Sequence, residues 1–487
     1  MTLNSLPYAA FLVIAAALHS RLRPWRRNGF LLAVSWLFYV LCAPRFLPLL
    51  LASTVLCYGL GLAMEARPGW RKGLLAAGLV LGFGVLFAYK YLGFFGRLAS
   101  SLLGRLGLAP LALPVLVAPV GLSFYTFTLA GYLVDVCRGK RPAERNFCDF
   151  ALFASFFPAV LSGPIERADH LLPQLKEHRR ANAGPTAGDV KAGVTRFLLG
   201  LAKKMILADQ LAIAVNTAFA NPAQFTGVQL LLAAMAYSLQ IYCDFSAYSD
   251  MAIGSGRLLG ITLLENFNAP YLCRSIQDFW RRWHISLSSW FRDYLYIPLG
   301  GSRRGTVRKY GNVLIVFAVS GLWHGAAVTF LVWGLLNGLY QVAGALLAPA
   351  RRRVREALRL REDGTPLRLV QAAVCFLLLT VAWVFFRAES LGKAGEILGR
   401  IATMAGGVFP LGVTALGLSR ARLLAVCLAA AALFVLEVLG QKRPLTDRLC
   451  ATVWPRYAVW VGLVLAIAVF GAYGAGYDAQ EFVYFQF

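Results

Sequence analysis

The feature that most constrains the fold is an uncharged run from Asn312 to Ala348. These 37 residues contain no Asp, Glu, Lys or Arg and a single histidine, His324, within the sequence Ser-Gly-Leu-Trp-His-Gly-Ala. Only lipid or other apolar helices can solvate such a run, and an imidazole inside it needs a hydrogen-bond partner or a water-filled cavity. His324 is therefore the first candidate functional residue.

The run is too long for one membrane span of about 20 residues, and the small residues Ser320, Gly321 and Gly325 offer a place to break it. Basic residues stand at both outer ends, so we expect a hairpin whose ends both face the cytoplasm. Its first arm, Asn312 to Leu322, reaches only ~17 Å at about 1.5 Å per residue. This arithmetic places His324 near the membrane midplane. The alternative is a loop histidine at the far interface, which applies if the first arm begins inside the membrane.

Composition predicts an all-α polytopic membrane protein. The chain has 487 residues, of which 59% are hydrophobic and only 15% charged, whereas soluble domains have about 25% charged residues. We expect one integral membrane domain over residues 1–487, with roughly eleven spans and shorter re-entrant pieces. The candidate spans include Leu74–Tyr89, Val115–Val136, Gln229–Ile241, Leu369–Phe386, Leu423–Val438 and Val459–Tyr473.

A net charge of +25 is compatible with nucleic-acid binding, but the basic residues fall in short loops beside apolar runs. That pattern is typical of orientation signals and of contacts with anionic lipid headgroups, so we expect a lipid partner and no nucleic acid. The alternation of basic loops places both termini outside the cytoplasm. At the carboxyl end, the basic residues expected inside are Lys442, Arg443 and Arg448.

No metal site or bound cofactor is expected. The nine cysteines include no Cys-x-x-Cys pair, and none lies at a metal-ligand spacing from a histidine. The chain also lacks the Gly-x-Ser-x-Gly elbow of a hydrolase and a Gly-rich phosphate loop.

Two carboxylates, Asp244 and Asp250, flank Tyr248 after an apolar run that begins at Phe225. Carboxylates at membrane depth must find partners. One interpretation is that they orient an imidazole or bind substrate. The interpretation that we favour from composition is that they cap the next helix by accepting hydrogen bonds from its backbone N–H groups.

The segment Arg274–Leu299 has the strongest amphipathic pattern. Its apolar positions recur every three or four residues at Ile276, Trp280, Trp283, Leu287, Trp290 and Tyr294. The opposing polar stripe contains Gln277, Arg281, His284, Ser288 and Arg292. We expect one helix at the membrane interface, with His284 facing either lipid headgroups or an aqueous vestibule. Helix position alone favours the headgroups.

Further upstream, Phe156–Pro158 and Ser162–Arg167 break a short apolar stretch, which predicts a re-entrant element. The polar segment from Glu166 to Gly188 follows. Its two histidines, His170 and His178, lie among charges, so we expect solvated side chains without a role.

Six motifs follow one another along about residues 119–390. They are Gly121–Phe127, Gly163–Arg167, Asp244–Gly254, Phe279–Ser288, Tyr294–Gly301 and Ser320–Gly325. Together, and in this order, they resemble the membrane-bound O-acyltransferase family. The resemblance is closest to its bacterial branch, represented by the membrane subunit of alginate O-acetylation and the D-alanyl transfer protein of teichoic acid.

The resemblance implies a ring of helices around a thin core, with funnels from both faces that meet at a catalytic histidine. That histidine maps onto His324, and the family's second histidine maps onto His284. No catalytic role is carried over to the two carboxylates. The residues expected to bind substrate or line the tunnel are Trp323, Asp244, Tyr248, Asp250, Trp283 and Ser288.

The implied reaction moves an acyl group, expected to be acetyl, from a cytoplasmic thioester, expected to be acetyl-CoA, to a hydroxyl outside a bacterial inner membrane. A neutral imidazole such as that of His324 can take the proton from the attacking hydroxyl. The acceptor is an exopolysaccharide or a periplasmic acyltransferase that modifies one. The competing hypothesis is a transporter or export component without covalent chemistry, but the chain shows no second copy of the His324 hairpin, and such folds usually contain internal repeats.

Overall fold

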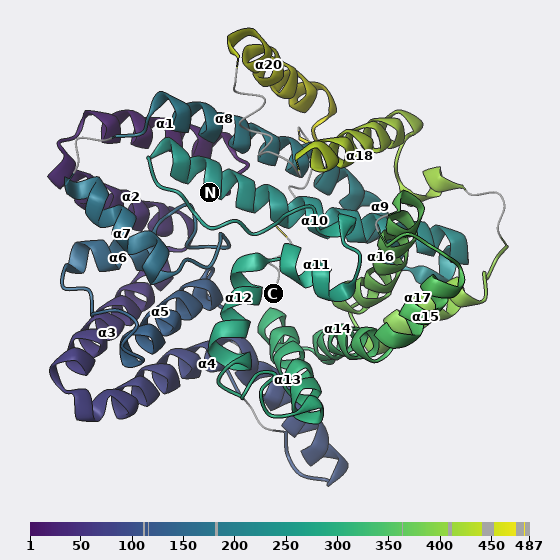
Figure 1. Ribbon diagram of the computed structural model, residues 1–487, viewed down its shortest axis with the longest axis horizontal. Coiled ribbons are helices and arrows are strands. Elements are labelled where there is room, and N and C mark those ends of the chain that lie inside the picture. The colour runs from purple at the N-terminus through teal and green to yellow at the C-terminus, as the bar shows by residue number, and fades with distance from the viewer. Residues whose placement is uncertain are drawn as a thin grey trace. The chain divides into compact units, whose positions relative to one another are not determined.

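The computed structural model describes residues 1–110, 113–114, 116–180, 184–362, 364–407, 412–440, 452–473 and 482, and these residues form helices and connections without a strand. Figure 1 shows this helical architecture. Seven of the described helical segments are long and apolar enough to cross a membrane, and the apolar helices Leu6–Arg21 and Leu122–Cys137 are shorter. The prediction of an all-α polytopic membrane protein is confirmed. Lys442, Arg443 and Arg448, which carried the prediction for the carboxyl terminus, lie outside the described residues.

The first of two compact units comprises Met1–Phe197 and Tyr248–Glu265. Its helices are α1 (Leu6–Arg21), α2 (Pro24–Cys42), α3 (Leu47–Ala66), α4 (Arg71–Arg105), α5 (Leu122–Cys137), α6 (Phe147–Ser155), α7 (Ala168–Arg180), most of α8 (Ala187–Ala202) and the end of α10 (Gly227–Leu258).

The predicted break after Phe156 is present in this unit as buried irregular backbone between α6 and α7. Irregular backbone is tolerated at membrane depth when protein surrounds it. Gly121 lets the chain pass close to the irregular backbone at Val160. Its φ is +82°, and a Cβ there would lie 2.4 Å from the carbonyl oxygen of Val160. Only glycine adopts that conformation without a steric penalty.

The prediction that His178 is solvated is wrong, since the side chain is buried. Its Nδ1 lies 3.2 Å from Asn28 Oδ1, its Nε2 lies 3.2 Å from the Leu259 carbonyl oxygen, and its ring stacks on His19 at 4.8 Å. The polar composition of α7 misled the prediction, because one face of this helix packs against α2 and α6.

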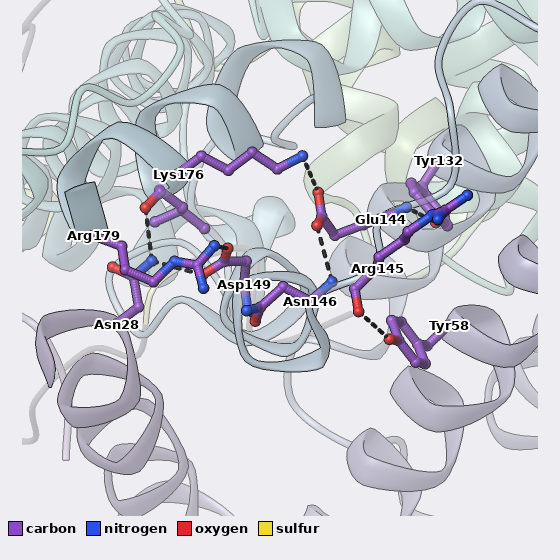
Figure 2. Close-up of polar contacts among 10 residues, drawn as sticks. Asn28, Tyr58, Tyr132, Glu144, Arg145, Asn146, Asp149, Lys176 and Arg179 are labelled. Atoms are coloured by element: carbon purple, nitrogen blue, oxygen red, sulfur yellow. Dashed lines mark hydrogen bonds and ion pairs between the residues drawn. The ribbon is translucent and has the colours of Figure 1, made fainter. Parts of the chain in front are cut away.

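Figure 2 shows how polar side chains tie these helices together. Asn28 of α2 donates to Asp149 of α6 at 2.8 Å, and Asp149 also pairs with Arg179 of α7 at 3.3 Å. Lys176 pairs with the buried Glu144 at 2.7 Å. Charged residues of a segment that the sequence suggests is a solvated loop therefore join three helices of the first unit.

His170 of α7 is the titratable partner of the buried carboxylate of Glu166, which precedes the helix. Its Nδ1 lies 2.8 Å from Glu166, and this hydrogen bond raises the pKa of His170 above its ordinary value of 6.5. While Glu166 is ionised, the interaction stabilises the fold fully below the unfolded pKa of His170 and is lost as pH rises through the folded pKa of His170. His170→Gln, which cannot titrate, should lower stability by about 1 kcal/mol or less at acidic pH. Thermal unfolding of parent and variant across pH measures the difference, and a difference that grows toward alkaline pH contradicts the assignment.

The second unit comprises Leu198–Ala247 and Asn266–Phe487. It begins with the end of α8, the π-helix η3 (Lys203–Ala208), α9 (Asp209–Ala220) and the first part of α10. Its further helices are α11 (Ile276–Arg282), α12 (Ile285–Phe291), the π-helix η6 (Arg292–Tyr296), α13 (Thr306–His324), α14 (Val328–Leu346), α15 (Ala348–Ala357), α16 (Thr365–Arg387), α17 (Leu391–Ala402), α18 (Arg420–Gly440) and α20 (Val453–Phe470).

The predicted hairpin is confirmed as α13 and α14, which lie side by side (Figure 1). Glycines let the two backbones approach closely: a Cβ at Gly321 would lie 2.3 Å from Phe330 O, and one at Gly334 would lie 2.2 Å from Phe317 O. Small residues are the usual solution where membrane helices meet backbone to backbone.

The first arm of this hairpin is longer than expected. Helix α13 begins at Thr306 and has 19 residues, which span ~28 Å at about 1.5 Å per residue. The basic residues Arg308 and Lys309 belong to the helix, because a change in charge does not end a backbone hydrogen-bond ladder. The depth of His324 in the membrane stays a prediction.

Candidate active site

His324 is the last residue of α13 and is 3% exposed. Three aromatic rings surround its imidazole edge-to-face, with centroid separations of 4.9 Å to Trp323, 5.0 Å to Trp333 and 5.3 Å to Phe386. We call these three side chains the aromatic cage. They come from α13, α14 and α16, so three helices fix the position of one imidazole.

The aromatic cage suits a histidine that accepts a proton during a reaction. Aromatic faces attract cations, by about 0.5–1 kcal/mol per ring at exposed sites and more when water is excluded. His324 also lies at the carboxyl end of α13, where the helix dipole favours positive charge. A ring that turns its face to the imidazole and the end of the helix both offset part of the desolvation cost of the charge that develops there.

A second layer of aromatic side chains supports the cage. Trp333 stacks on Trp383 at 5.5 Å and 27°, and Trp383 contacts Trp283 at 5.1 Å. Each of these three tryptophans is 1% exposed. Trp283 was expected to line a tunnel, and the structure places it in this buried core, next to His284 in the chain.

His284 does not lie on the polar stripe of one continuous helix, which corrects the prediction for Arg274–Leu299. Helix α11 ends at Arg282 and α12 begins at Ile285, with His284 between them at φ +43° and ψ +54°. The side chain is 1% exposed. The apolar stripe continues on both sides of the break, because both short helices bury the same kind of face, and periodicity alone therefore did not reveal the break.

Trp323 brings the two histidines into one site. Its ring lies 4.9 Å from His324 and 6.0 Å from His284, and Phe245 of α10 packs against His284 at 4.6 Å. Burial lowers the pKa of His284 to about 3, which keeps its imidazole neutral near pH 7. A neutral imidazole can donate one hydrogen bond and accept another.

Ser288 lies in α12, the helix directly after His284, and its hydroxyl points toward the backbone at the start of that helix. Its hydroxyl donates to the carbonyl oxygen of Trp283 at 3.2 Å, and its N–H donates to the carbonyl oxygen of His284 at 2.9 Å. These bonds close the first turn after His284. The predicted role of Ser288 in lining a tunnel stays a prediction.

The capping interpretation of Asp244 and Asp250 is wrong, because both lie inside α10, which begins at Gly227. Asp244 instead pairs with Lys204 at 2.7 Å, and Lys204 also pairs with Asp209 at 2.9 Å. All three side chains are at most 3% exposed. Lys204 could not be singled out from the sequence, since basic residues beside apolar runs resemble orientation signals.

Asp250 and Tyr248 belong to the first unit, whereas Asp244 and both histidines belong to the second. Asp250 pairs with Arg196 of α8 at 2.9 Å, and Arg196 also contacts Glu265 at 2.5 Å. Tyr248 is 1% exposed. Arg196 is a second cation that could not be singled out from the sequence. The available signal was its position in the interior of α8, away from the loops where orientation signals lie.

The family follows from comparison with known proteins. The model of the membrane-bound O-acyltransferase family matches residues 136–385. The chain belongs to this family. The matched residues include both histidines of the site, and the chain is accordingly an O-acyltransferase of the membrane.

Curated relatives support the same assignment. The probable alginate O-acetylase AlgI of Pseudomonas syringae pv. tomato is 39% identical over 378 residues, which cover 77% of this chain and 69% of the relative. The AlgI protein of Pseudomonas putida is 40% identical, with coverage of 77% and 74%. The peptidoglycan O-acetyltransferase of Helicobacter pylori is 34% identical over 394 residues, with coverage of 76% and 72%.

Proposed function

We propose that the chain transfers an acetyl group from a cytoplasmic thioester, with acetyl-CoA as the expected donor, to a hydroxyl on the outer side of a bacterial inner membrane. The acceptor is an exopolysaccharide, or a periplasmic partner acyltransferase that passes the group to one. The relatives named as O-acetylases of alginate and peptidoglycan support the acyl group and the class of acceptor. The observation that carries the proposal is His324, buried in its aromatic cage beside a second histidine.

In the proposed mechanism, His324 acts as the general base. Its neutral imidazole takes the proton of the acceptor hydroxyl while the hydroxyl oxygen attacks the thioester carbonyl carbon. The C–S bond then breaks, and the leaving thiolate receives the proton from the imidazolium. His284 holds the acceptor or the carbonyl through a hydrogen bond, since its burial favours the neutral form.

The proposed topology follows the distribution of basic loops, with the donor side in the cytoplasm and both termini outside. Family membership favours the enzyme over an exporter without covalent chemistry. A thioester on one side and a hydroxyl on the other then meet at one histidine, and no free acetylated carrier has to cross the membrane.

The test mixes the purified protein in lipid nanodiscs with an isotopically labelled acetyl thioester as the donor. Oligosaccharides or a secreted protein serve as the acceptor. Mass spectrometry should show a labelled acetyl ester on the acceptor and free thiol from the donor, in equal amounts. Omission of either substrate is the control. If the donor is hydrolysed without an ester on any acceptor, the proposal fails. It also fails if, in a separate assay, polysaccharide crosses the membrane of proteoliposomes that contain the protein without being acetylated.

A further inference from the structure

His284 has a backbone conformation that side chains rarely adopt. Its φ of +43° and ψ of +54° lie in the left-handed region, where a Cβ crowds the following carbonyl oxygen. Such residues persist only where the surrounding structure over-determines them, and they cluster at functional sites. Neighbouring residues must therefore hold His284 in this conformation.

Asn266 meets the chain immediately after His284. It is fully buried, and its carbonyl oxygen accepts from the Ile285 N–H at 3.0 Å. Its side-chain Oδ1 accepts from both the N–H and the hydroxyl of Ser286, at 3.3 and 2.6 Å. A backbone N–H can only donate, so the atom that faces Ser286 is the amide oxygen and not the amide nitrogen.

The chain before His284 is held by the same segment. Phe267 forms an antiparallel bridge with Trp283, and the Asn268 N–H donates to the Arg282 carbonyl oxygen at 3.0 Å. Residues 266–268 therefore run beside residues 282–286 and fix the turn on both sides. Of these contacts, only those of Asn266 Oδ1 come from a side chain, so only they can be removed by substitution without altering the backbone.

We propose that Asn266 is a positioning residue for acyl transfer, which acts by holding His284 in the left-handed turn that presents its imidazole to Trp323. This inference rests on the proposed function. If the turn relaxed to the right-handed region, φ would change by roughly 100°, and the imidazole would leave its place between Phe245 and Trp323. Displacing a catalytic group by about 1 Å can reduce a rate about 10²-fold.

The first experiment compares Asn266→Ala with Asn266→Asp. The alanine variant should lose about tenfold to 10²-fold in acetyl transfer per folded molecule. The aspartate variant keeps an oxygen that accepts from both groups of Ser286, and the complete burial of residue 266 favours the protonated, neutral carboxyl over a buried charge. It should therefore stay within about threefold of the parent. Asn268→Ala is the matched control, because it changes the same residue type two positions away on an exposed side chain, and its activity should equal that of the parent.

The second experiment asks whether Asn266 acts through His284. If it does, Asn266→Ala should lower acetyl transfer by less than about twofold in a His284→Ala background, since the effects of residues that act through one another are not additive. Ser286→Ala removes one of the two side-chain bonds and serves the same cycle if Asn266→Ala does not fold. Losses that multiply would overturn the inference, as would an aspartate variant no more active than the alanine variant.

His284→Ala alone distinguishes a failure of the proposed function from a failure of the positioning role of Asn266. If this variant keeps full activity, the role of His284 in the proposed function is wrong and the inference falls with it. If it is impaired while the folded Asn266→Ala protein is not, the positioning role alone is wrong. If both are impaired and their effects do not multiply, both stand.

Discussion

His324→Ala should abolish acetyl transfer, with a loss of roughly 10²–10⁴-fold, while the protein still inserts and folds. The loss is large because the aromatic cage contains no other group that can take a proton. The fold should survive because the cage side chains also pack against Trp383 and Phe330 and against one another. His324→Gln keeps a polar side chain of similar size without a proton acceptor of comparable basicity, and it should be as inactive as the alanine variant.

The measurement is transfer from a labelled thioester by purified, folded protein, with melting temperatures recorded beside the parent. His170→Ala is the matched control, since it makes the same chemical change in the first unit, at a histidine whose partner is Glu166. Its activity per folded molecule should not change. If either His324 variant melts like the parent and keeps more than about a tenth of its turnover, the general-base role is wrong, because the expected loss is far larger.

The features that the sequence could predict depend on composition over long stretches. An uncharged run of 37 residues with small residues near its middle had to fold back on itself, and α13 and α14 do so at His324. Glycines at 321 and 334 matter because the helix backbones touch there. The sequence offered the residues for this contact, but not the pairing, which depends on the register of two helices.

The features that the sequence could not predict depend on single distant partners. The break at His284 keeps the apolar stripe intact and is set by hydrogen bonds to Asn266, in another segment of the chain. Similarly, Asp244 was wrongly predicted to cap a helix, because its actual partner, Lys204, lies 40 positions earlier in a different helix and is not apparent from the local sequence. Local propensity describes neither interaction, since each exists only after the chain has folded.

Lys204 carries the largest expected effect on stability. It is 1% exposed and lies between Asp209 and Asp244, at 2.9 and 2.7 Å. Lys204→Met keeps the length of the side chain but removes the cation that pairs with two buried carboxylates. Removing one partner of a buried ion pair costs about 3–5 kcal/mol, because the remaining charge has lost its water and its counter-ion. We therefore expect a marked fall in melting temperature and in the yield of folded protein.

Two comparisons separate this effect from a general loss of packing. Lys203→Met changes the neighbouring lysine, which is only half-buried and contacts Ser246 at 3.2 Å, and it should be far less destabilising. Lys204→Met combined with Asp209→Asn and Asp244→Asn removes both carboxylate charges together with the lysine and should recover much of the lost stability, since replacing a whole buried ionic group is often close to neutral. Thermal unfolding in detergent measures all three proteins. A triple variant no more stable than Lys204→Met would mean that Lys204 contributes by packing, and the electrostatic account of this cluster would then be wrong.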